Sequence, residues 1–368
     1  MYVQQETETL LLQLAAIPAP SGQEDQRVAF IKAWLEHIGC ESVCIDDAKN
    51  VVYTYHPELP GPVDLFCAHT DVVFGDMTPL PMAMSGDTLT GPGCGDDTAS
   101  LVLMLLALKE LRESGIVPQR PMVFAANSCE EGLGNLKGSR HLVATYQGRL
   151  HSFTSFDAHW GQVVDTAVGS ERYRITCRTA GGHSYRDYGA KNAIVDMATL
   201  ISLLSGQTTP DDFTTCNVGT IAGGTTVNSI PSECTITYEY RATSKESLAV
   251  MRRQLENLVA ECAERGLRFT VEPIGCRPTG KLEDAHQQQL VALAERVIRH
   301  NGGYPVRCVG SNDCNVPLSV GIPSVCLGIY EGAGSHTRQE TVKLSSLKAG
   351  FKATLEYLKQ IAQGALDW

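Results

Sequence analysis

The chain has 368 residues, which at about 150 residues per domain is enough for two domains with cores of ordinary size. Its composition, 43% hydrophobic and 19% charged, is typical of a folded globular protein. Its net charge of −11 argues against a nucleic-acid or anionic-membrane partner, because both require a basic surface.

The first half of the chain alternates helix and strand patterns. Apolar residues at helical spacing predict three helices, over residues 7–16, 26–37 and 99–113. Asp97 or Thr98 is placed to cap the third helix. Short apolar runs predict four strands, over residues 50–55, 63–68, 121–126 and 151–156. Because strands alternate with helices, we expect an α/β fold with a mixed, mostly parallel sheet flanked by helices.

The pattern changes near Gly169 and changes back after Gly280. Between them the order is β-α-β-β-α-β, over residues 171–179, 192–204, 213–221, 233–241, 245–265 and 268–274. This split βαβ order predicts an inserted ferredoxin-like α+β domain. The alternation then resumes with a helix over residues 284–300 and a strand over residues 322–329. We therefore expect a discontinuous first domain, residues 1–168 and 284–368, interrupted by a second domain of residues 169–283.

The sequence argues against membrane insertion and secretion. The longest apolar run, residues 101–108, is far too short to span a bilayer. The first ten residues, MYVQQETETL, include acids but no basic residue, which argues against a signal peptide. The 13 cysteines form no CxxC pair, which argues against a disulfide framework and fits a reducing compartment. We therefore expect a cytoplasmic protein with no membrane partner.

Residues of types that commonly bind metals follow the strands expected in the first domain. They are His69 and Asp71 after residues 63–68, Glu130 and Glu131 after 121–126, Asp157 after 151–156, and His336 after 322–329. Asp96 and Asp97 directly precede the helix expected over residues 99–113. Because the carboxyl ends of parallel strands meet at one edge of a sheet, we expect these side chains to converge there.

Taken singly, each of these residues has a simpler explanation. A histidine after a strand is often a structural hydrogen-bonding group, and adjacent acids are often a solvated surface or a helix N-cap. Together, however, the carboxylates would repel one another unless a positive charge lay among them. A pair of divalent ions is the natural counterion, and mixed nitrogen and oxygen ligands suit Zn²⁺, with Mn²⁺ or Co²⁺ as alternatives.

Five motifs resemble those of the M20 metallopeptidases, a group of di-zinc exopeptidases and N-acyl amino acid hydrolases. They are HTDVV at His69, GCGDD at Asp96, CEEG at Glu130, the loop at Asp157 and GSHT at His336. The resemblance covers essentially the whole chain, and the tripeptide-aminopeptidase-like members look most similar. It implies a zinc-exopeptidase-like fold in which the inserted domain is a lid.

The resemblance implies a ligand set for two metal ions. His69, Asp96 and Asp157 would hold one ion, and Glu131, His336 and the shared Asp96 would hold the other. A carboxylate that bridges two ions is typical of such paired sites.

The resemblance also implies roles for two neighbouring acids. Asp71 would orient the His69 ring, and Glu130 would be the general base, free of metal. Family members often read Asp-x-Lys at the bridging aspartate, where this chain reads Asp-Asp-Thr, so Asp97 stays an alternative bridge. A second branch of the family has a Cys-Gly-His-Asp metal motif, which Cys94 and its neighbours faintly echo.

Three residues of the inserted domain resemble family residues that reach the substrate. His183, in GGHS, would polarise the substrate carbonyl, and Asn228, in TTVNSIP, would contact the substrate. Arg277, in GCRPTG, would bind a substrate carboxylate. The simpler interpretations are a surface-loop histidine and a surface arginine at a hinge. In some relatives the lid also mediates dimerisation, which suggests a homodimer.

Two further groups of residues receive no firm role. Asp313, in GSNDCNVP, matches a family loop near the metals, but no role for it follows from the sequence. Packing is the preferred interpretation of Cys67 and Cys129, which flank the expected ligands.

The most favoured function is hydrolysis of the amide bond in di- or tripeptides by metal-activated water. An N-acyl amino acid deacylase uses the same metal centre and is the first alternative. A non-catalytic binding protein is disfavoured because all five expected ligands and Glu130 are present. A redox or zinc-storage protein is disfavoured because no two cysteines have the CxxC spacing of such proteins.

Overall fold

The computed structural model describes residues 3–207, 214–366 and 368. Two compact units make up the chain, one of Met1–Ala167 with Lys281–Trp368 and one of Val168–Gly280. The sequence places these boundaries after residue 168 and before residue 284. Each unit has its own sheets and its own hydrophobic core, which in the larger unit has two parts.

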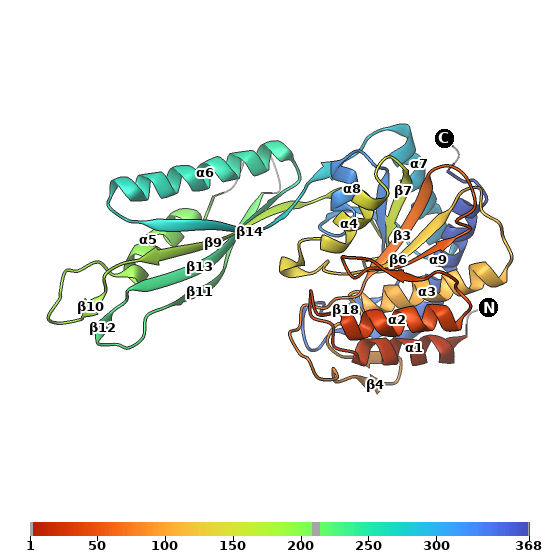
Figure 1. The fold of residues 1–368 in the computed structure, drawn as a ribbon, viewed down its shortest axis with the longest axis horizontal. Helices are drawn as coiled ribbons and strands as arrows, with labels where there is room; N and C mark the ends of the chain where they lie inside the picture. Colours follow the sequence, from red (N-terminus) through yellow and green to blue (C-terminus); the bar gives the residue numbers. More distant parts are fainter. Residues whose placement is uncertain (1–2, 208–213, 367) are drawn as a thin grey trace. The chain divides into compact units, whose positions relative to one another are not determined.

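The larger unit is built on a mixed sheet, ordered β1-β2-β6-β3-β7-β17-β8-β15 with β16 beside β8 (Figure 1). These strands are β1 (Cys44–Ile45), β2 (Val51–Tyr55), β3 (Val63–His69), β6 (Met122–Asn127), β7 (Leu150–Ser155), β8 (Gln162–Ala167), β15 (Gly280–Lys281), β16 (Val306–Gly310) and β17 (Ser324–Leu327). The central run β6-β3-β7-β17 is parallel, whereas β2 and β8 join it in antiparallel fashion. The carboxyl ends of the central strands therefore share one edge of the sheet.

Helices cover both faces of this sheet. They are α1 (Gln4–Ala16), α2 (Asp25–His37), α3 (Thr98–Glu113), α4 (Lys137–Thr145), α7 (Ala285–His300), α8 (Asn315–Ser319) and α9 (Leu347–Ala362), with short 3₁₀ turns η1 (Gly132–Gly134) and η2 (Leu344–Ser346). Alternate residues of β3 point to opposite faces, as the period of a strand requires. Phe66 and Ala68 pack in a core with α1, α2, α3, α7 and α9, while Leu65 and Cys67 pack in a second core with α4 and α8 (Figure 1).

A small antiparallel sheet of the larger unit carries the segment around His336. Its strands lie in the order β18-β19-β5-β4. They are β4 (Ala83–Ser85), β5 (Thr88–Thr90), β18 (Gly332–Ala333) and β19 (Thr341–Lys343). The turn between β18 and β19 contains His336, and Glu340 lies directly before β19.

The smaller unit has the strand and helix order that the sequence predicts. Its antiparallel sheet is ordered β11-β13-β9-β14, and α5 and α6 pack on one face (Figure 1). The elements are β9 (Gly169–Arg178), α5 (Ala193–Leu204), β11 (Thr215–Gly223), β13 (Glu233–Ala242), α6 (Lys245–Glu264) and β14 (Phe269–Arg277). A short pair, β10 (Gly182–His183) and β12 (Ser229–Ile230), forms a separate ladder. The expected start of the third element, Phe213, lies outside the described residues.

The prediction that Asp97 or Thr98 is placed to cap α3 is confirmed in position for Asp97 and wrong for Thr98, which is the first residue of the helix. Asp97 occupies the N-cap position, but its side chain makes no capping bond to the helix. Instead, Asp97 Oδ2 accepts the backbone N–H of His69 at 2.9 Å. Thr98 Oγ1 donates to the backbone oxygen of Gly93 at 2.6 Å. The two side chains therefore connect the start of α3 to the end of β3 and to the loop that precedes the helix.

Within the described chain, no helix combines the length and the apolar character that crossing a bilayer requires.

Candidate metal centre

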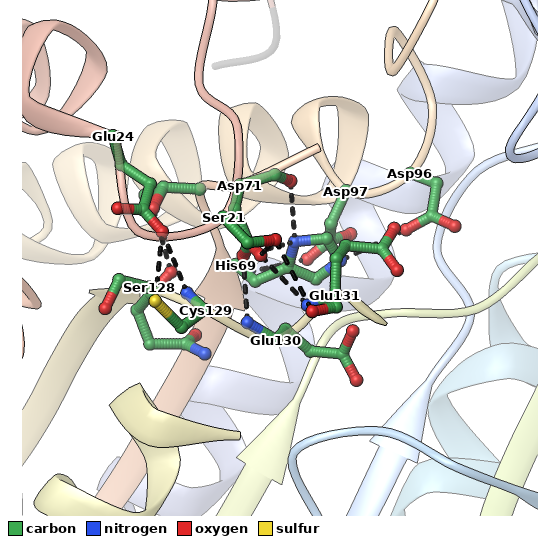
Figure 2. A network of polar contacts seen from close by, with 12 residues as sticks. Ser21, Glu24, His69, Asp71, Asp96, Asp97, Ser128, Cys129, Glu130 and Glu131 are labelled. Atoms are coloured by element: carbon green, nitrogen blue, oxygen red, sulfur yellow. Dashed lines mark hydrogen bonds and ion pairs between the residues drawn. The ribbon is translucent and has the colours of Figure 1, made fainter. Parts of the chain in front are cut away.

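Imidazoles and carboxylates from five segments gather at the carboxyl edge of the parallel strands, as the sequence predicts. His69 ends β3, Glu130 and Glu131 follow β6, Asp157 follows β7, and Asp96 precedes α3. Three sets of ligand atoms each lie within 4.8 Å of one another: His69, Asp97 and Asp157; His69, Glu130 and Glu131; and Asp96, Glu131 and His336. Figure 2 shows several of these side chains around His69.

Asp96 lies between the two histidines. Its Oδ1 is 3.1 Å from His69 Nε2, and its Oδ2 is 3.2 Å from His336 Nε2. His336 Nε2 is also 3.1 Å from Glu131 Oε1. One carboxylate therefore presents one oxygen to each imidazole.

Asp97 lies on the His69 side of the cluster, together with Asp157. The ligand atoms of Asp97, Asp157 and His69 lie within 4.8 Å of one another. The ligand set that contains His336 includes Asp96 but not Asp97. The two adjacent aspartates thus differ in position: Asp96 faces both histidines, and Asp97 faces one.

The charges of the cluster are strongly coupled. Burial raises the pKa of Asp157 well above its usual value, and the negative charge of Asp96 adds to this effect. Burial acts in the same direction on the pKa of Asp97, as does the charge of Asp157. Hydrogen bonds to Asp96 and Glu131 raise the pKa of His336 to about 10. Divalent ions among these carboxylates would reduce their mutual repulsion, and the nitrogen and oxygen donors of the three ligand sets fit such ions.

The ring of His69 is oriented by the backbone of Asp71. His69 Nδ1 is 3.0 Å from the Asp71 backbone oxygen and 3.4 Å from its Oδ1. A proton on Nδ1 therefore has the backbone oxygen as its acceptor, and Nε2 is the nitrogen that faces the cluster.

The carboxylate of Asp71 holds the turn that carries the two glutamates. Its Oδ1 accepts the backbone N–H of Glu130, and its Oδ2 accepts that of Glu131, both at 2.9 Å (Figure 2). The preceding residue, Cys129, has a left-handed φ of 56°, and so does His336, at 65°. Residues other than glycine keep this conformation only where surrounding contacts hold them, which is common at functional sites.

Residues near the N-terminus support this turn, and the sequence interpretation missed them. Ser21 Oγ donates to Asp71 Oδ2 at 2.6 Å. Glu24 is fully buried, and its Oε1 accepts the backbone N–H of Cys129 at 3.1 Å (Figure 2). Arg27, also fully buried, donates to the backbone oxygen of Thr70 at 2.9 Å. The only signal was the spacing Ser-x-x-Glu before a helix, which is also the spacing of a capping box.

The three candidate residues of the smaller unit lie at two places within it. His183 and Ser229 are partners in the short ladder β10–β12, so His183 and Asn228 are neighbours. His183 Nδ1 accepts the backbone N–H groups of Tyr185 at 3.2 Å and Arg186 at 3.3 Å, which leaves the proton of the neutral ring on Nε2.

Arg277 ends β14 and is 4% exposed, so it is not the surface arginine considered as its simpler interpretation. Its partner in the sheet register is Ser170 at the start of β9. Long cationic side chains are rarely buried unless they have a partner or a function.

Asp313 is fully buried next to the end of β6. Its Oδ2 accepts a hydrogen bond from Asn127 Nδ2 at 2.7 Å. Burial raises the pKa of Asp313 to about 7, with a further contribution from the negative charge of Glu130.

Across the described residues all thirteen cysteines are free, and the four close to the motifs are buried: Cys67, Cys94, Cys129 and Cys314. No cysteine belongs to any of the three ligand sets found among the described residues.

A mixed α/β fold with imidazoles and carboxylates at the carboxyl ends of its parallel strands is typical of a metal-binding enzyme. The profile of the peptidase family M20/M25/M40 matches residues 65–360, which is most of the chain. The chain therefore belongs to this family and is a hydrolase of the M20 type.

Curated relatives align over nearly the full length. A LysW-lysine/LysW-ornithine hydrolase from Sulfurisphaera tokodaii is 24% identical over 365 residues, covering 96% of this chain and 94% of the relative. The uncharacterized protein YqjE of Bacillus subtilis is 26% identical over 328 residues, covering 86% and 85% of the two chains.

Solved structures share the fold. A tripeptidase from Staphylococcus aureus superposes with a TM-score of 0.81 at 23% identity, over 99% of this chain and 100% of the other. The aminopeptidase PepT from Bacillus cereus superposes with a TM-score of 0.74 at 21% identity, over 98% and 99%. Human carnosine dipeptidase 1 gives a TM-score of 0.77 at 15% identity, over 98% and 96%. These likenesses establish the mixed α/β architecture.

Proposed function

We propose that this chain is a two-metal exopeptidase that hydrolyses the amide bond of di- or tripeptides. The observation that carries the proposal is the position of Asp96, whose two oxygens face His69 Nε2 and His336 Nε2 at 3.1 and 3.2 Å. A carboxylate so placed is suited to bridging two cations. Asp97 faces only the His69 side and is the less suitable bridge.

In this proposal the residues for two ions form two groups that share Asp96. His69 and Asp157 would hold one ion with Asp96, and Glu131 and His336 would hold the other. Bound there, the ions, most suitably Zn²⁺ with Co²⁺ or Mn²⁺ as alternatives, would polarise the scissile carbonyl and lower the pKa of water.

Glu130 is the proposed general base. It is 4% exposed, and its backbone is fixed by Asp71 in the same turn that carries Glu131. In this role its carboxylate takes a proton from the attacking water and later gives it to the leaving amine. A base held by its backbone stays in reach of the reacting atoms without needing a metal bond.

The smaller unit is proposed to act as a lid over the substrate. The free Nε2–H of His183 suits a hydrogen bond to the oxyanion that develops on the substrate carbonyl. Asn228, next to His183 in the ladder, would contact the substrate backbone, and Arg277 would bind its terminal carboxylate. These residues would meet the substrate when the two units close on it. A homodimer through this unit remains part of the proposal.

A second candidate is the release of an amino acid from an N-acyl group. It is favoured by the curated relative named for action on LysW-lysine and LysW-ornithine. Both candidates cleave an amide with the same metal centre and differ in the acyl group, which lies on the carbonyl side of that bond.

A hydrolysis screen on the full chain loaded with Zn²⁺ separates the two candidates. It compares dipeptides, tripeptides and N-acetyl amino acids at equal concentration, with the Glu130→Gln variant as the inactive control. The proposal expects the highest kcat/KM on a di- or tripeptide. Turnover of N-acetyl amino acids alone would replace the first candidate by the second, and equal turnover by the control would refute both.

A further inference from the structure

Glu340 is a buried acid that the roles proposed above do not use. It lies four residues after His336, directly before β19, and is 1% exposed. Its carboxylate faces the loop of residues 91–96, about 245 positions earlier in the chain. That loop carries Asp96 into the metal centre.

Three backbone N–H groups of the loop point at this one carboxylate. Glu340 Oε2 accepts the N–H of Gly93 at 2.8 Å. Glu340 Oε1 accepts the N–H of Gly95 at 3.1 Å and that of Asp96 at 2.7 Å. Because three N–H groups of one loop converge on a single carboxyl group, that side chain fixes the path of the loop backbone.

The backbone of Glu340 holds the same loop. Its carbonyl oxygen accepts the N–H of Gly91 at 2.9 Å and lies 3.5 Å from Cys94 Sγ. The approach at Gly95 is so close that a Cβ there would lie 2.7 Å from Glu340 Oε1 and 2.8 Å from a ring carbon of Tyr330. The loop is therefore wrapped on Glu340 as closely as glycine allows.

We propose that Glu340 is a positioning residue for Asp96: it fixes the loop so that one carboxylate can serve both ions of the centre. The segment 336–340 then has two tasks, since His336 faces one oxygen of Asp96 and Glu340 holds the Asp96 backbone. This inference rests on the proposed two-metal function, because a bridging carboxylate has a purpose only between two ions.

In this role Glu340 resembles Asp71, because each carboxylate holds the backbone of a turn that carries expected metal ligands. Asp71 accepts the N–H groups of Glu130 and Glu131, and Glu340 accepts those of Gly93, Gly95 and Asp96. In each case a buried carboxylate outside the ligand set fixes a turn that carries ligands. Supporting residues of this kind typically change metal affinity or activity about 10- to 100-fold when they are altered.

The test is the variant Glu340→Gln in the full chain, titrated with Zn²⁺ by calorimetry and assayed on the best peptide substrate. A glutamine keeps the size but presents an amide NH₂ group to one side of the N–H cradle. We expect the affinity for the second Zn²⁺ ion to bind in the titration to fall about 10- to 100-fold, and kcat to fall by a similar factor. KM should be nearly unchanged, because Glu340 does not touch substrate. Glu340→Asp, which keeps both acceptor oxygens, should recover part of each loss.

Glu331→Gln is the matched control, because Glu331 lies on the same hairpin in an exposed pair with Lys343 at 2.8 Å. It should bind both ions as the wild type does. A folded Glu340→Gln with wild-type zinc affinities and kcat would overturn the proposal. If that variant does not fold, wild-type zinc affinities and kcat in a folded Glu340→Ala, which has no acceptor oxygen, would overturn it instead. A wild-type chain that binds fewer than two ions would overturn this inference and the proposed function together.

Discussion

The Oδ1 atom of Asp71 accepts the backbone N–H of Glu130 at 2.9 Å, so the proposed base is held by an acid 59 positions earlier in the chain. The same carboxylate also accepts the N–H of Glu131 and the hydroxyl of Ser21. The backbone of both glutamates is therefore held by one buried side chain that lies just after β3.

Replacing Asp71 by asparagine should damage the centre without removing a ligand. The amide of the substituted side chain can accept at only one atom, so one of the two N–H groups of the turn loses its partner. We expect kcat and the zinc affinity to fall about 10- to 100-fold, measured by steady-state kinetics and calorimetry. Asp165→Asn, at a partly exposed contact 3.8 Å from Arg307, should change neither. Unchanged kcat and zinc affinity in Asp71→Asn would show that the turn keeps its conformation without the Asp71 carboxylate.

Glu130→Gln should separate turnover from metal binding. The variant keeps the backbone contact to Asp71 but cannot take a proton, so we expect kcat to fall on the order of 10²–10⁴-fold with both ions retained. The ion content is measured by elemental analysis and kcat with a saturating peptide. Near-normal turnover with both ions bound would assign the base to another residue.

The two adjacent aspartates should respond differently to substitution. Asp96→Asn should weaken the binding of both ions, because the two oxygens of Asp96 face the two histidines. Asp97→Asn should weaken only the ion on the His69 side, since Asp97 shares a ligand set with His69 and Asp157 but not with His336. Calorimetric titration with Zn²⁺ resolves the two steps. The reverse pattern would make Asp97 the bridge.

The structure explains which parts of the site could be predicted from sequence. His69, Glu131 and Asp157 each follow a strand of the parallel run β6-β3-β7, and the edge they share follows from that topology. The small sheet that carries His336 was not predicted, because β18 and β19 have two and three residues, too few for a strand pattern.

The supporting residues could not be predicted, for a different physical reason. Ser21 and Asp71 are 50 positions apart, and Glu340 and Asp96 are 244 positions apart. Such contacts depend on how distant segments pack, and no local spacing encodes them. For Asp97 the local pattern predicted a helix cap, but its oxygen accepts from the backbone of His69 instead.

Arg277 should decide whether the substrate carboxylate is recognised. If it binds that carboxylate, Arg277→Ala should lower kcat/KM for a free dipeptide about ten- to a hundredfold, since a hydrogen bond to a charged group contributes roughly 1.5–3 kcal/mol. The same dipeptide with its carboxylate blocked as an amide should already be poor and should not become poorer.

The control for this prediction is Arg174→Ala. Arg174 belongs to the same sheet and pairs with Glu272 at an exposed position, so its loss should leave both substrates unaffected. Equal turnover of the free and amidated dipeptides by the wild type would remove the carboxylate anchor, and recognition would then rest on the amino end of the substrate.

The metal content of the active chain tests the central claim most directly. Protein freed of metal, reloaded with Zn²⁺, freed of excess ion and assayed on a dipeptide should contain two ions per chain by elemental analysis. His69→Ala and His336→Ala should each reduce this content toward one ion, because each removes the imidazole on one side of Asp96. A fully active chain that holds one ion or none would contradict the account.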